Sequence, residues 1–497
     1  MSDPLDFSNS PAAELPAGGA PDKVVSTGGY SDSEGQRKDI LKVALTALAG
    51  TSIEFYDFFL YGTAAALVFP SVFFPKDNSP LVGLLASFST FAIGFFARPA
   101  GAMVFGHFGD RVGRKSTLVI ALVLMGISTT LIGCLPTYES VGLLAPALLV
   151  FLRIMQGFAL GGQWGGAVLI ITESAPKGRR GFYGSFAQMG APIGTILANV
   201  AFLSVSVSVT PSALLSWAWR IPFLFSVLLI AIGVFIQLNL KETPAFRRLN
   251  ENHMNPHALP VVDTAAEVDG DLRLEPVRLA PEITRHRYPV AQVLRRHPKE
   301  ILVAAGIFLG MQVSFYILVA FSVAYGTKAS GLNLPSSTML TAVLFGATAM
   351  IPGIFLGSII SDQHGRRGIL MLSAFFLGIW SFAIFPLINT GSLLWIAVAV
   401  CVGQLFNGMI FGPLAALFSE MFETSVRYSG ASLGYQIGTL LGGALAPLIA
   451  TALFARFQSW VPIAVYMSTA CAVTIFSASR LPDTRAVDMA TLGREAR

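Results

Sequence analysis

The sequence predicts an all-α integral membrane protein with twelve transmembrane helices in two six-helix pseudo-symmetric bundles. Three observations lead to this fold class. The 497 residues are 54% hydrophobic and only 12% charged, whereas a soluble domain carries about 25% charged residues. Apolar runs recur along the chain that reach the roughly 20 residues needed to cross a bilayer. Segments half a chain apart also repeat each other, which predicts an internal duplication.

The apolar runs are bounded by charged residues or by clusters of Pro and Gly, and each is expected to form a helix. A long polar stretch separates the sixth run from the seventh and predicts a linker between two halves. The twelve runs cover residues 41–68, 81–107, 116–135, 142–173, 182–208, 218–239, 301–326, 337–361, 368–388, 393–421, 429–454 and 461–479.

The domain organisation follows from these runs. The first residues are rich in Ser, Gly, Pro, Asp and Ala, and no apolar run follows a basic start as in a cleavable signal. We therefore expect a disordered cytoplasmic tail over 1–38, an N-terminal six-helix bundle over 39–240, a cytoplasmic linker over 241–299, a C-terminal six-helix bundle over 300–480 and a cytoplasmic tail over 481–497.

The formal net charge of +5 lies mostly in loops between apolar runs, so it predicts orientation in the membrane rather than a nucleic-acid partner. With the N-terminus inside, nine Lys and Arg residues of the short loops fall on the cytoplasmic side and four on the other. This bias predicts that both termini are cytoplasmic. The three cysteines have no metal-type spacing, so we expect no metal site and no disulfide framework.

The internal repeat is clearest in the segment GHFGDRVGRK, from Gly106 to Lys115, which has its counterpart in GSIISDQHGRR, from Gly357. Two further echoes occur in the same order, which indicates two homologous halves. The matched residues are Asp110 with Asp362, Arg114 with Arg366, Glu173 with Glu420, Arg180 with Arg427, and Thr195 with Thr439.

Four charged residues in the apolar runs of the first half lie away from the helix ends: Glu54, Asp57, Arg98 and Arg153. A charge at the bilayer centre costs about 2.5 to 3.5 kcal/mol unless it is paired or wetted, so such residues are candidates for function. Glu54 and Asp57 are three apart and share a helix face. The cluster is predicted either to bring proton and substrate together, because a cation and desolvation act oppositely on a carboxyl, or to be a salt-bridge network that fixes helix packing.

The second half has no charge at mid-membrane but contains amides and phenols. Such groups can bind the hydroxyl or carboxylate groups of a solute, or they can form hydrogen bonds between helices. The candidates are Gln312, Tyr316, Gln404, Asn407, Tyr435 and Gln436.

Four motifs carry a resemblance to a known family. They are GTSIEFYDFFLYG from Gly50, ARPAGAMVFGHFGDRVGRK from Ala97, LRIMQGFALGGQWGGA from Leu152 and SVRYSGASLGYQIGTLLGG from Ser425. Together with the twelve spans they resemble the major facilitator superfamily, and within it the metabolite:proton symporter family, over residues 40 to 480.

This resemblance implies a secondary active transporter that imports a small organic metabolite with protons by alternating access. Arg98 and Arg153 favour a carboxylate-bearing solute. The proton is the expected coupling ion, with no other cofactor. The expected cellular location is the plasma membrane, of the bacterial inner-membrane type. We expect a monomer and no enzyme, because no nucleophile–base pair, cofactor loop or metal cluster is visible.

The site residues are assigned to three roles. Proton coupling is expected at Asp57, Glu54 and Arg98. Substrate binding is expected at Arg98, Arg153, Gln163, Tyr316, Gln312, Asn407, Tyr435 and Gln436. Gating is expected at Asp110, Arg111, Arg114, Glu173, Arg180, Asp362, Arg366, Glu420 and Arg427, where an acid can accept from backbone N–H groups at a neighbouring helix end and pair with an arginine.

Two departures from the family pattern keep alternatives open. Gln163 stands where the family commonly has Glu, and Gln cannot titrate. Phe55 stands where Trp is usual, so an indole N–H donor is lost. Coupling therefore depends on Asp57 or Glu54, or the protein is a proton-independent facilitator. A solute sensor on a transporter fold is the other alternative, although the linker and the final tail are small for a partner-binding domain.

Overall fold

The computed structural model describes residues 32–75, 79–112, 114–161, 168–169, 171–172, 175–176, 178–239, 295, 297–329, 332–422 and 427–481. The chain divides into two units, Met1–Asp39 and Ile40–Arg497. The second unit contains every candidate membrane span among the described residues. Nearly all of the predicted linker, and most of the two predicted tails, lie outside the described residues.

Every element among these residues is a helix, as the composition predicted. The first half of the chain forms α1 (Asp32–Leu67), α2 (Phe69–Val72), α3 (Pro80–Val112), α4 (Arg114–Gly133), α5 (Tyr138–Val141), α6 (Leu144–Leu160), α8 (Arg180–Gln188), α9 (Gly190–Ser208), α10 (Pro211–Ala213), the π-helix η1 (Leu214–Ala218) and α11 (Arg220–Asn239).

The second half contains three π-helices, each continuous with α-helical segments. Its elements are α14 (Pro298–Tyr316), η2 (Ile317–Phe321), α15 (Ser322–Ala324), η3 (Tyr325–Ala329), α16 (Ser336–His364), α17 (Arg366–Asn389), α18 (Leu393–Met421), α19 (Arg427–Thr439), η4 (Leu440–Ala444), α20 (Ala446–Phe457) and α21 (Val461–Ser479).

The predicted spans agree with these helices. Within the described residues, nine helices are long and apolar enough to cross a membrane. A tenth candidate, Pro211–Ala218 with Arg220–Phe235, is bent by 50° and corresponds to the predicted run 218–239, which begins at the break. Two shorter apolar helices, Val119–Gly133 and Leu144–Leu160, correspond to the third and fourth runs. Each of the twelve predicted runs therefore contains an apolar helix among the described residues.

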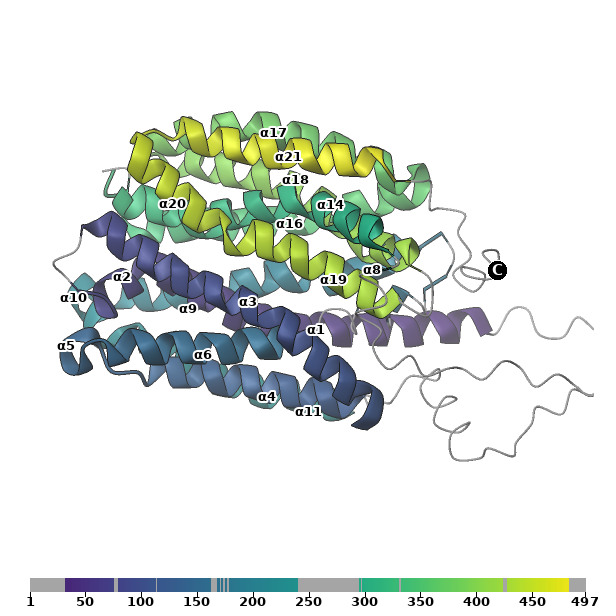
Figure 1. The fold of residues 1–497 in the computed structure, drawn as a ribbon, viewed down its shortest axis with the longest axis horizontal. Helices are drawn as coiled ribbons and strands as arrows, with labels where there is room; N and C mark the ends of the chain where they lie inside the picture. Colours follow the sequence, from purple (N-terminus) through teal and green to yellow (C-terminus); the bar gives the residue numbers. More distant parts are fainter. Residues whose placement is uncertain are drawn as a thin grey trace, which may run out of the picture. The chain divides into compact units, whose positions relative to one another are not determined.

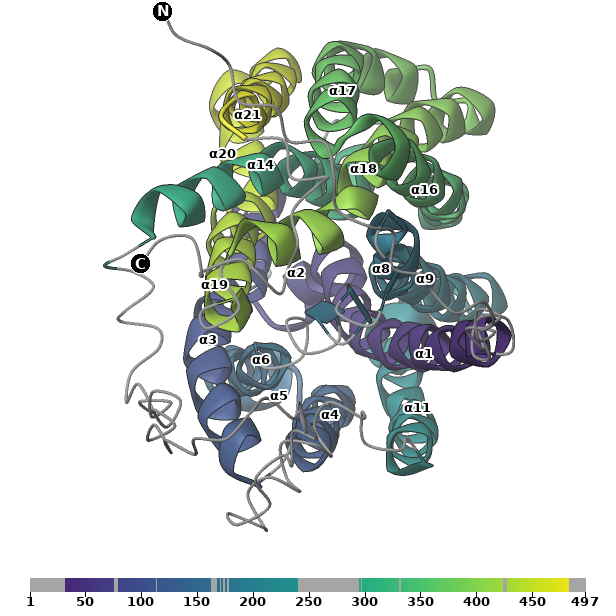
Figure 2. The same cartoon turned by 90° about the vertical axis from the view of Figure 1, so that its right-hand side faces the viewer.

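The two halves repeat the same helix contacts. In the first half α3 packs on α6, and α4 on α6 and α11; in the second, α16 packs on α18, and α17 on α18 and α21. Figures 1 and 2 show the blue and purple helices of the first half beside the green and yellow helices of the second. The halves meet where α9 lies along α16 and where α3 lies along α19, η4 and α20.

Glycines bring the repeated helix pairs into very close contact. A Cβ on Gly157 would lie 1.8 Å from the Gly94 carbonyl oxygen, and one on Gly101 would lie 1.8 Å from the Phe158 oxygen. The matching seam between α16 and α18 would bring a Cβ on Gly353 to 2.3 Å from the Leu405 oxygen. Small residues of this kind let membrane helices approach closely. The seam sets the distance between the arginines carried by α3 and α6.

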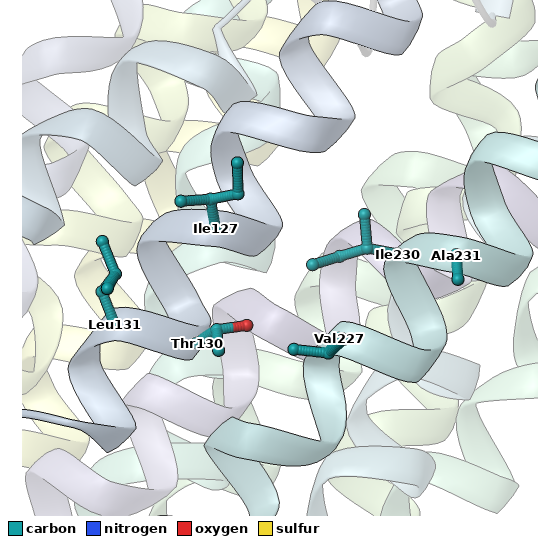
Figure 3. Close-up of a pocket in the computed structure, with 6 residues that line it drawn as sticks. All are labelled: Ile127, Thr130, Leu131, Val227, Ile230 and Ala231. Carbon is teal, nitrogen blue, oxygen red and sulfur yellow. The ribbon is translucent and has the colours of Figure 1, made fainter.

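Large apolar side chains face outwards, as expected for a lipid-facing surface. Phe235 is 69% exposed, and Leu302 and Leu394 are each 67% exposed. An apolar groove also lies on this surface between α4 and α11, lined by Ile127, Thr130, Leu131, Val227, Ile230 and Ala231 (Figure 3). Ile127 and Val227 are among the exposed residues, so the groove faces the surrounding lipid.

Candidate functional site

Arg153 of α6 is fully buried in a box of aromatic rings. Its guanidinium carbon lies 4.2 Å from the ring centre of Tyr61, 4.5 Å from that of Phe58 and 4.8 Å from that of Phe91. A Cβ on Gly94 would lie 2.6 Å from the Arg153 Nε, so glycine makes room for the guanidinium. Desolvated cation–π contacts contribute about 2 kcal/mol, and they hold the charge in place without neutralising it.

Arg98 of α3 lies next to this box. Its guanidinium carbon is 4.5 Å from the ring centre of Phe58 and 4.4 Å from that of Phe95. Phe58 therefore contacts both buried arginines. Arg98 also lies within electrostatic range of Glu54 and of two residues of the second half, Tyr316 and Tyr435. This arginine thus lies where the two halves meet.

Asp57 has a different set of neighbours. Ser226 Oγ of α11 donates to Asp57 Oδ1 at 2.7 Å, and Thr129 of α4 lies near the same carboxyl, with its hydroxyl donating to the Met125 carbonyl at 3.0 Å. Gln156 Nε2 donates to Thr129 Oγ1 at 2.6 Å, and Arg153 Nη1 donates to Gln156 Oε1 at 2.9 Å. A chain of hydrogen bonds therefore joins the buried arginine to Thr129, which lies beside the buried acid.

The two acids on α1 do not share one environment, although they lie three residues apart. Glu54 lies within electrostatic range of Arg98, towards the second half. Asp57 is bound by the Ser226 hydroxyl of α11. Positions three apart differ by about 60° around a helix, and that difference directs the two side chains to different neighbours.

Both arginines retain hydrogen-bond donors that no described residue accepts. Nε and Nη2 of Arg98, and Nε and Nη2 of Arg153, are buried without a partner among the described residues. A buried guanidinium without an acceptor is costly, and a carboxylate is its best-matched partner, with two parallel hydrogen bonds. The unused donors can therefore hold an anionic group.

The polar residues of the second half form two smaller groups. Gln312 Nε2 donates to Thr439 Oγ1 at 2.9 Å. Asn407 Nδ2 donates to Gln404 Oε1 at 3.3 Å, while Gln404 Nε2 and Asn407 Oδ1 have no partner among the described residues. Gln436 Oε1 is likewise buried without one. These amides offer one donor and two acceptors to a polar solute.

The internal repeat shows which residues of the second half stand at the positions of the mid-membrane charges of the first. With the glycine seams aligned, Gly157 and Gly161 correspond to Gly408 and Gly412, each 251 positions later. The same offset matches Arg153 with Gln404 and Gln156 with Asn407. In each half the two residues lie three positions apart and are hydrogen-bonded to each other. The second half thus keeps the hydrogen bond and replaces the cation by an amide.

A second correspondence concerns Asp57. Gly194 packs on Phe55 of α1, and Gly438 packs on Phe308 of α14. When Phe55 is aligned with Phe308, Asp57 falls at the position of Gly310. The Gly310 amide donates to Thr474 Oγ1 of α21 at 2.9 Å, where Asp57 accepts from Ser226 of α11. The second half therefore has a glycine where the first has its acid.

Aromatic rings join the halves around Arg98. The Phe59 ring centre lies 5.3 Å from that of Phe315, and the Phe95 centre lies 5.5 Å from that of Tyr316. Phe58 contributes a further contact with Tyr316 at 6.2 Å. Such pairs contribute about 0.5 to 1.5 kcal/mol each beyond their burial, so the two halves are held against each other beside the arginines.

A latch closes one end of the interface between the halves. Asp362, near the end of α16, accepts hydrogen bonds from the backbone N–H groups of Gly181 at 3.0 Å and Phe182 at 2.9 Å, in the first turn of α8. It also forms an ion pair with Arg366. An acid at a helix N-terminus satisfies free N–H groups and the helix dipole. This is the geometry expected for the GDRVGRK segment, seen in its second copy.

Arg366 extends the latch to α18. Its Nη2 lies 3.0 Å from Glu420 Oε1. Gly365, between α16 and α17, has φ of +98°, a conformation that favours glycine. Two further contacts close the same end across the halves: Thr172 Oγ1 lies 2.8 Å from Ser419 Oγ, and Gln188 Nε2 donates to the Phe411 carbonyl at 3.1 Å.

The remaining predicted gating residues are described in part. Arg180 begins α8 and Arg427 begins α19, and both are buried. Glu173 and Gln163 lie outside the described residues, and so do the side chains of three residues in the first copy of the latch, Asp110, Arg111 and Arg114. In the part of the chain that the structure describes, no group of three or more His, Cys, Asp and Glu residues is placed to hold a metal ion.

Replacing Asp362 by Asn tests the latch. Hydrogen bonds to a charged group contribute about 1.5 to 3 kcal/mol, and every 1.4 kcal/mol is a factor of ten. In D362N we expect hydrogen exchange at the amides of Gly181 and Phe182 to accelerate at least about tenfold. The exposed neighbour His364 supplies the matched control H364Q. Unchanged exchange in D362N would contradict the assignment.

Sequence reasoning missed several of these residues. Thr129, Ser226 and the rings of Phe58, Tyr61 and Phe91 are uncharged residues in apolar runs, and nothing in their spacing marks them. Gln156 was detectable, because it follows Arg153 by three positions and so lies on the same helix face. The pairing of Arg366 with Glu420 is long-range and had no local signal.

Comparisons with known proteins all match transporters. The model of the Sugar (and other) transporter family matches residues 42–495. The inner membrane metabolite transport protein YhjE of Escherichia coli is 37% identical, with 89% of this chain and 94% of that protein covered. The shikimate transporter of Escherichia coli is 35% identical, with 89% and 95% covered. The partially occluded inward open structure of the Escherichia coli xylose transporter XylE has a TM-score of 0.66 at 16% identity, covering 90% of this chain and 99% of that one.

Proposed function

The chain belongs to the Sugar (and other) transporter family of the major facilitator superfamily, and from this premise we propose that it moves a small carboxylate-bearing metabolite together with protons by alternating access. Its relatives are membrane transporters of small molecules. The protein is accordingly a multi-pass membrane transporter and no enzyme, as predicted from its sequence.

The observation that carries the carboxylate proposal is the pair of buried arginines with unused donors. Arg98 and Arg153 each retain two N–H-bearing nitrogens without an acceptor among the described residues. A carboxylate can accept two parallel hydrogen bonds from one guanidinium. The 35% identity with a transporter of shikimate, itself a carboxylate, supports the same substrate class.

Proton coupling is supported by the buried acids beside these arginines. Glu54 and Asp57 are 5% and 1% exposed. A buried carboxyl that is sometimes charged and sometimes neutral changes the electrostatic field at Arg98 and Arg153, so loading of a proton can alter the affinity for an anion. Protons are the coupling ion in this scheme, with no other cofactor.

The alternative is a proton-independent facilitator of the same solutes. Gln163, which cannot titrate, favours it. The buried acid Asp57 favours symport, because it lies in the same half as both arginines and can titrate without any contribution from residue 163.

The proposal includes location and orientation. We place the protein in a plasma membrane of the bacterial inner-membrane type, consistent with the inner membrane relative. Both termini and the latch end lie on the cytoplasmic side, consistent with the excess of Lys and Arg in the loops of that side. The transporting unit is a monomer.

Uptake into proteoliposomes tests symport directly. A thermal-stabilisation screen against small acids and zwitterions, with shikimate as the first probe, selects the solute. A pH difference of about one unit stores about 1.4 kcal/mol, enough for about tenfold accumulation with one proton per solute. We expect accumulation above equal concentrations when the outside is acidic, abolished by a protonophore. Uptake that stops at equal concentrations would identify a facilitator.

A further inference from the structure

A single ring of the second half lies among four rings of the first. The Tyr316 ring centre is 5.5 Å from that of Phe95 and 5.9 Å from that of Phe91, both on α3. It is 6.2 Å from the centres of Phe58 and Phe59 on α1. Ring pairs attract each other at separations of about 4.5 to 7 Å. These four phenylalanines form an aromatic cup on the first half, and the buried phenol ring of Tyr316 occupies it.

Arg98 lies against two rings of this cup. Its guanidinium carbon is 4.4 Å from the ring centre of Phe95 and 4.5 Å from that of Phe58. Its Nε and Nη2 are buried without an acceptor among the described residues. The N–H groups of these two nitrogens point from the same edge of the planar guanidinium, and one such edge donates two parallel hydrogen bonds to a carboxylate. An unused carboxylate-binding edge therefore lies beside the aromatic cup.

The second buried arginine contacts the same rings. The Arg153 guanidinium carbon is 4.5 Å from the ring centre of Phe58 and 4.8 Å from that of Phe91. Three of the four cup rings thus have a cation over them. Charges interact more strongly in a buried site than in water, so both cations attract an anion that enters the cup. The cup therefore favours a ring that carries negative charge over a neutral ring.

The internal repeat shows that helix packing does not require these rings. With α1 aligned to α14 at an offset of 253 positions, and α3 to α16 at an offset of 252, each cup position has a counterpart in the second half. All four counterparts are buried, and none is aromatic. They are Met311, Gln312, Val343 and Ala347. The duplicated fold therefore packs without rings at these positions, and the aromatic cup is an added feature of the first half.

The chemistry of the cup limits the body of a solute that binds there. The side chains of the four phenylalanines are hydrocarbon, so they offer no hydrogen bond to a hydroxyl group. A hydroxyl buried without a partner is costly, which disfavours a solute with several hydroxyls. An aromatic body can form the same edge-to-face and tilted contacts that Tyr316 forms in the cup.

From this geometry we propose that the solute is a carboxylate carried on an aromatic ring, whose ring replaces that of Tyr316 in the cup while its carboxylate binds the free edge of Arg98. The inference rests on the proposed transport of carboxylates and narrows its substrate class. When the two halves separate during alternating access, the Tyr316 ring leaves the cup with the second half. A solute ring of the same shape then restores the lost ring contacts.

Titration calorimetry of the purified full-length protein with two matched acids tests the proposal. Benzoate and cyclohexanecarboxylate each carry one carboxylate on a six-membered ring and differ in aromaticity. Each ring contact contributes about two- to tenfold in affinity, and the cup offers several, so benzoate should bind at least about tenfold more tightly. Benzyl alcohol, which keeps the ring and lacks the carboxylate, should bind more weakly than benzoate. Shikimate, whose ring is not aromatic and carries hydroxyls, should also bind more weakly.

Replacing Phe95 by Leu removes one ring of the cup and keeps an apolar side chain. F95L should reduce the preference for benzoate over cyclohexanecarboxylate by about two- to tenfold. The adjacent Phe96 is 57% exposed on the outer surface and supplies the matched control F96L, which should keep the wild-type preference. The preference is a ratio of two affinities of one preparation, and thermal unfolding without solute shows that each variant is folded.

Three outcomes would overturn the proposal: equal affinity of the wild type for benzoate and cyclohexanecarboxylate, tighter binding of shikimate than of benzoate, or an equal change of preference in F95L and F96L. In each of these cases acids still bind, so only the aromatic substrate class fails. Failure of the proposed function is recognised separately, because then no acid stabilises the protein in the thermal screen or wild-type proteoliposomes accumulate no acid under a pH difference.

Discussion

Replacing Arg98 by Ala is expected to abolish uptake of the solute at low concentration. Arg98 is 2% exposed, lies where the halves meet, and retains two nitrogens without an acceptor among the described residues. Truncating one partner of a buried charge pair costs about 2 to 5 kcal/mol, and every 1.4 kcal/mol is a factor of ten, so initial uptake should fall by about thirtyfold or more. The measurement is the initial rate of labelled solute uptake into proteoliposomes, with the thermal unfolding of R98A recorded alongside.

Two further variants serve as controls for R98A. R98K retains the positive charge and loses the planar fork that binds a carboxylate through two hydrogen bonds, so it should recover only part of the uptake. Arg220 lies 4.6 Å from the ring centre of Trp219 and donates to backbone carbonyls. R220A should therefore transport much more than R98A. Near-normal uptake in R98A would exclude Arg98 from the substrate site.

Replacing Asp57 by Asn is expected to separate transport from energy coupling. Asn can still accept from Ser226, and the size of the side chain is unchanged, so the helices should keep their contacts. It cannot take up and release a proton. D57N should therefore lose accumulation above equal concentrations under a pH difference, a loss of about tenfold for each unit of pH, while exchange of internal for external solute continues.

The matched variant is E54Q, which neutralises the other buried acid on the same helix. Counterflow and pH-driven uptake, measured on the same vesicles, separate the two acids. If E54Q loses accumulation and D57N keeps it, the proton carrier is Glu54, next to Arg98. If D57N loses exchange and accumulation to the same degree, Asp57 acts in packing or binding and not in coupling.

Local properties of the chain were enough to predict much of this protein. A run of about 20 apolar residues is a membrane helix wherever its neighbours lie, so the spans, the two halves and the fold class followed from hydropathy and from the repeat. The cost of burying charge in lipid likewise marked Glu54, Asp57, Arg98 and Arg153. The latch motif predicted an acid at a neighbouring helix end, and Asp362 has that geometry.

Only the tertiary structure decided which groups meet. Glu54 and Asp57 looked alike in the sequence, yet one lies near Arg98 while the other is bound by Ser226, 169 positions away. Asp362 binds amides of the other half, and Arg366 binds Glu420 from a separate helix. Hydrogen bonds act over about 3 Å and depend on direction. Their partners are therefore set by how closely the glycine seams bring the helices together, which no stretch of sequence specifies alone.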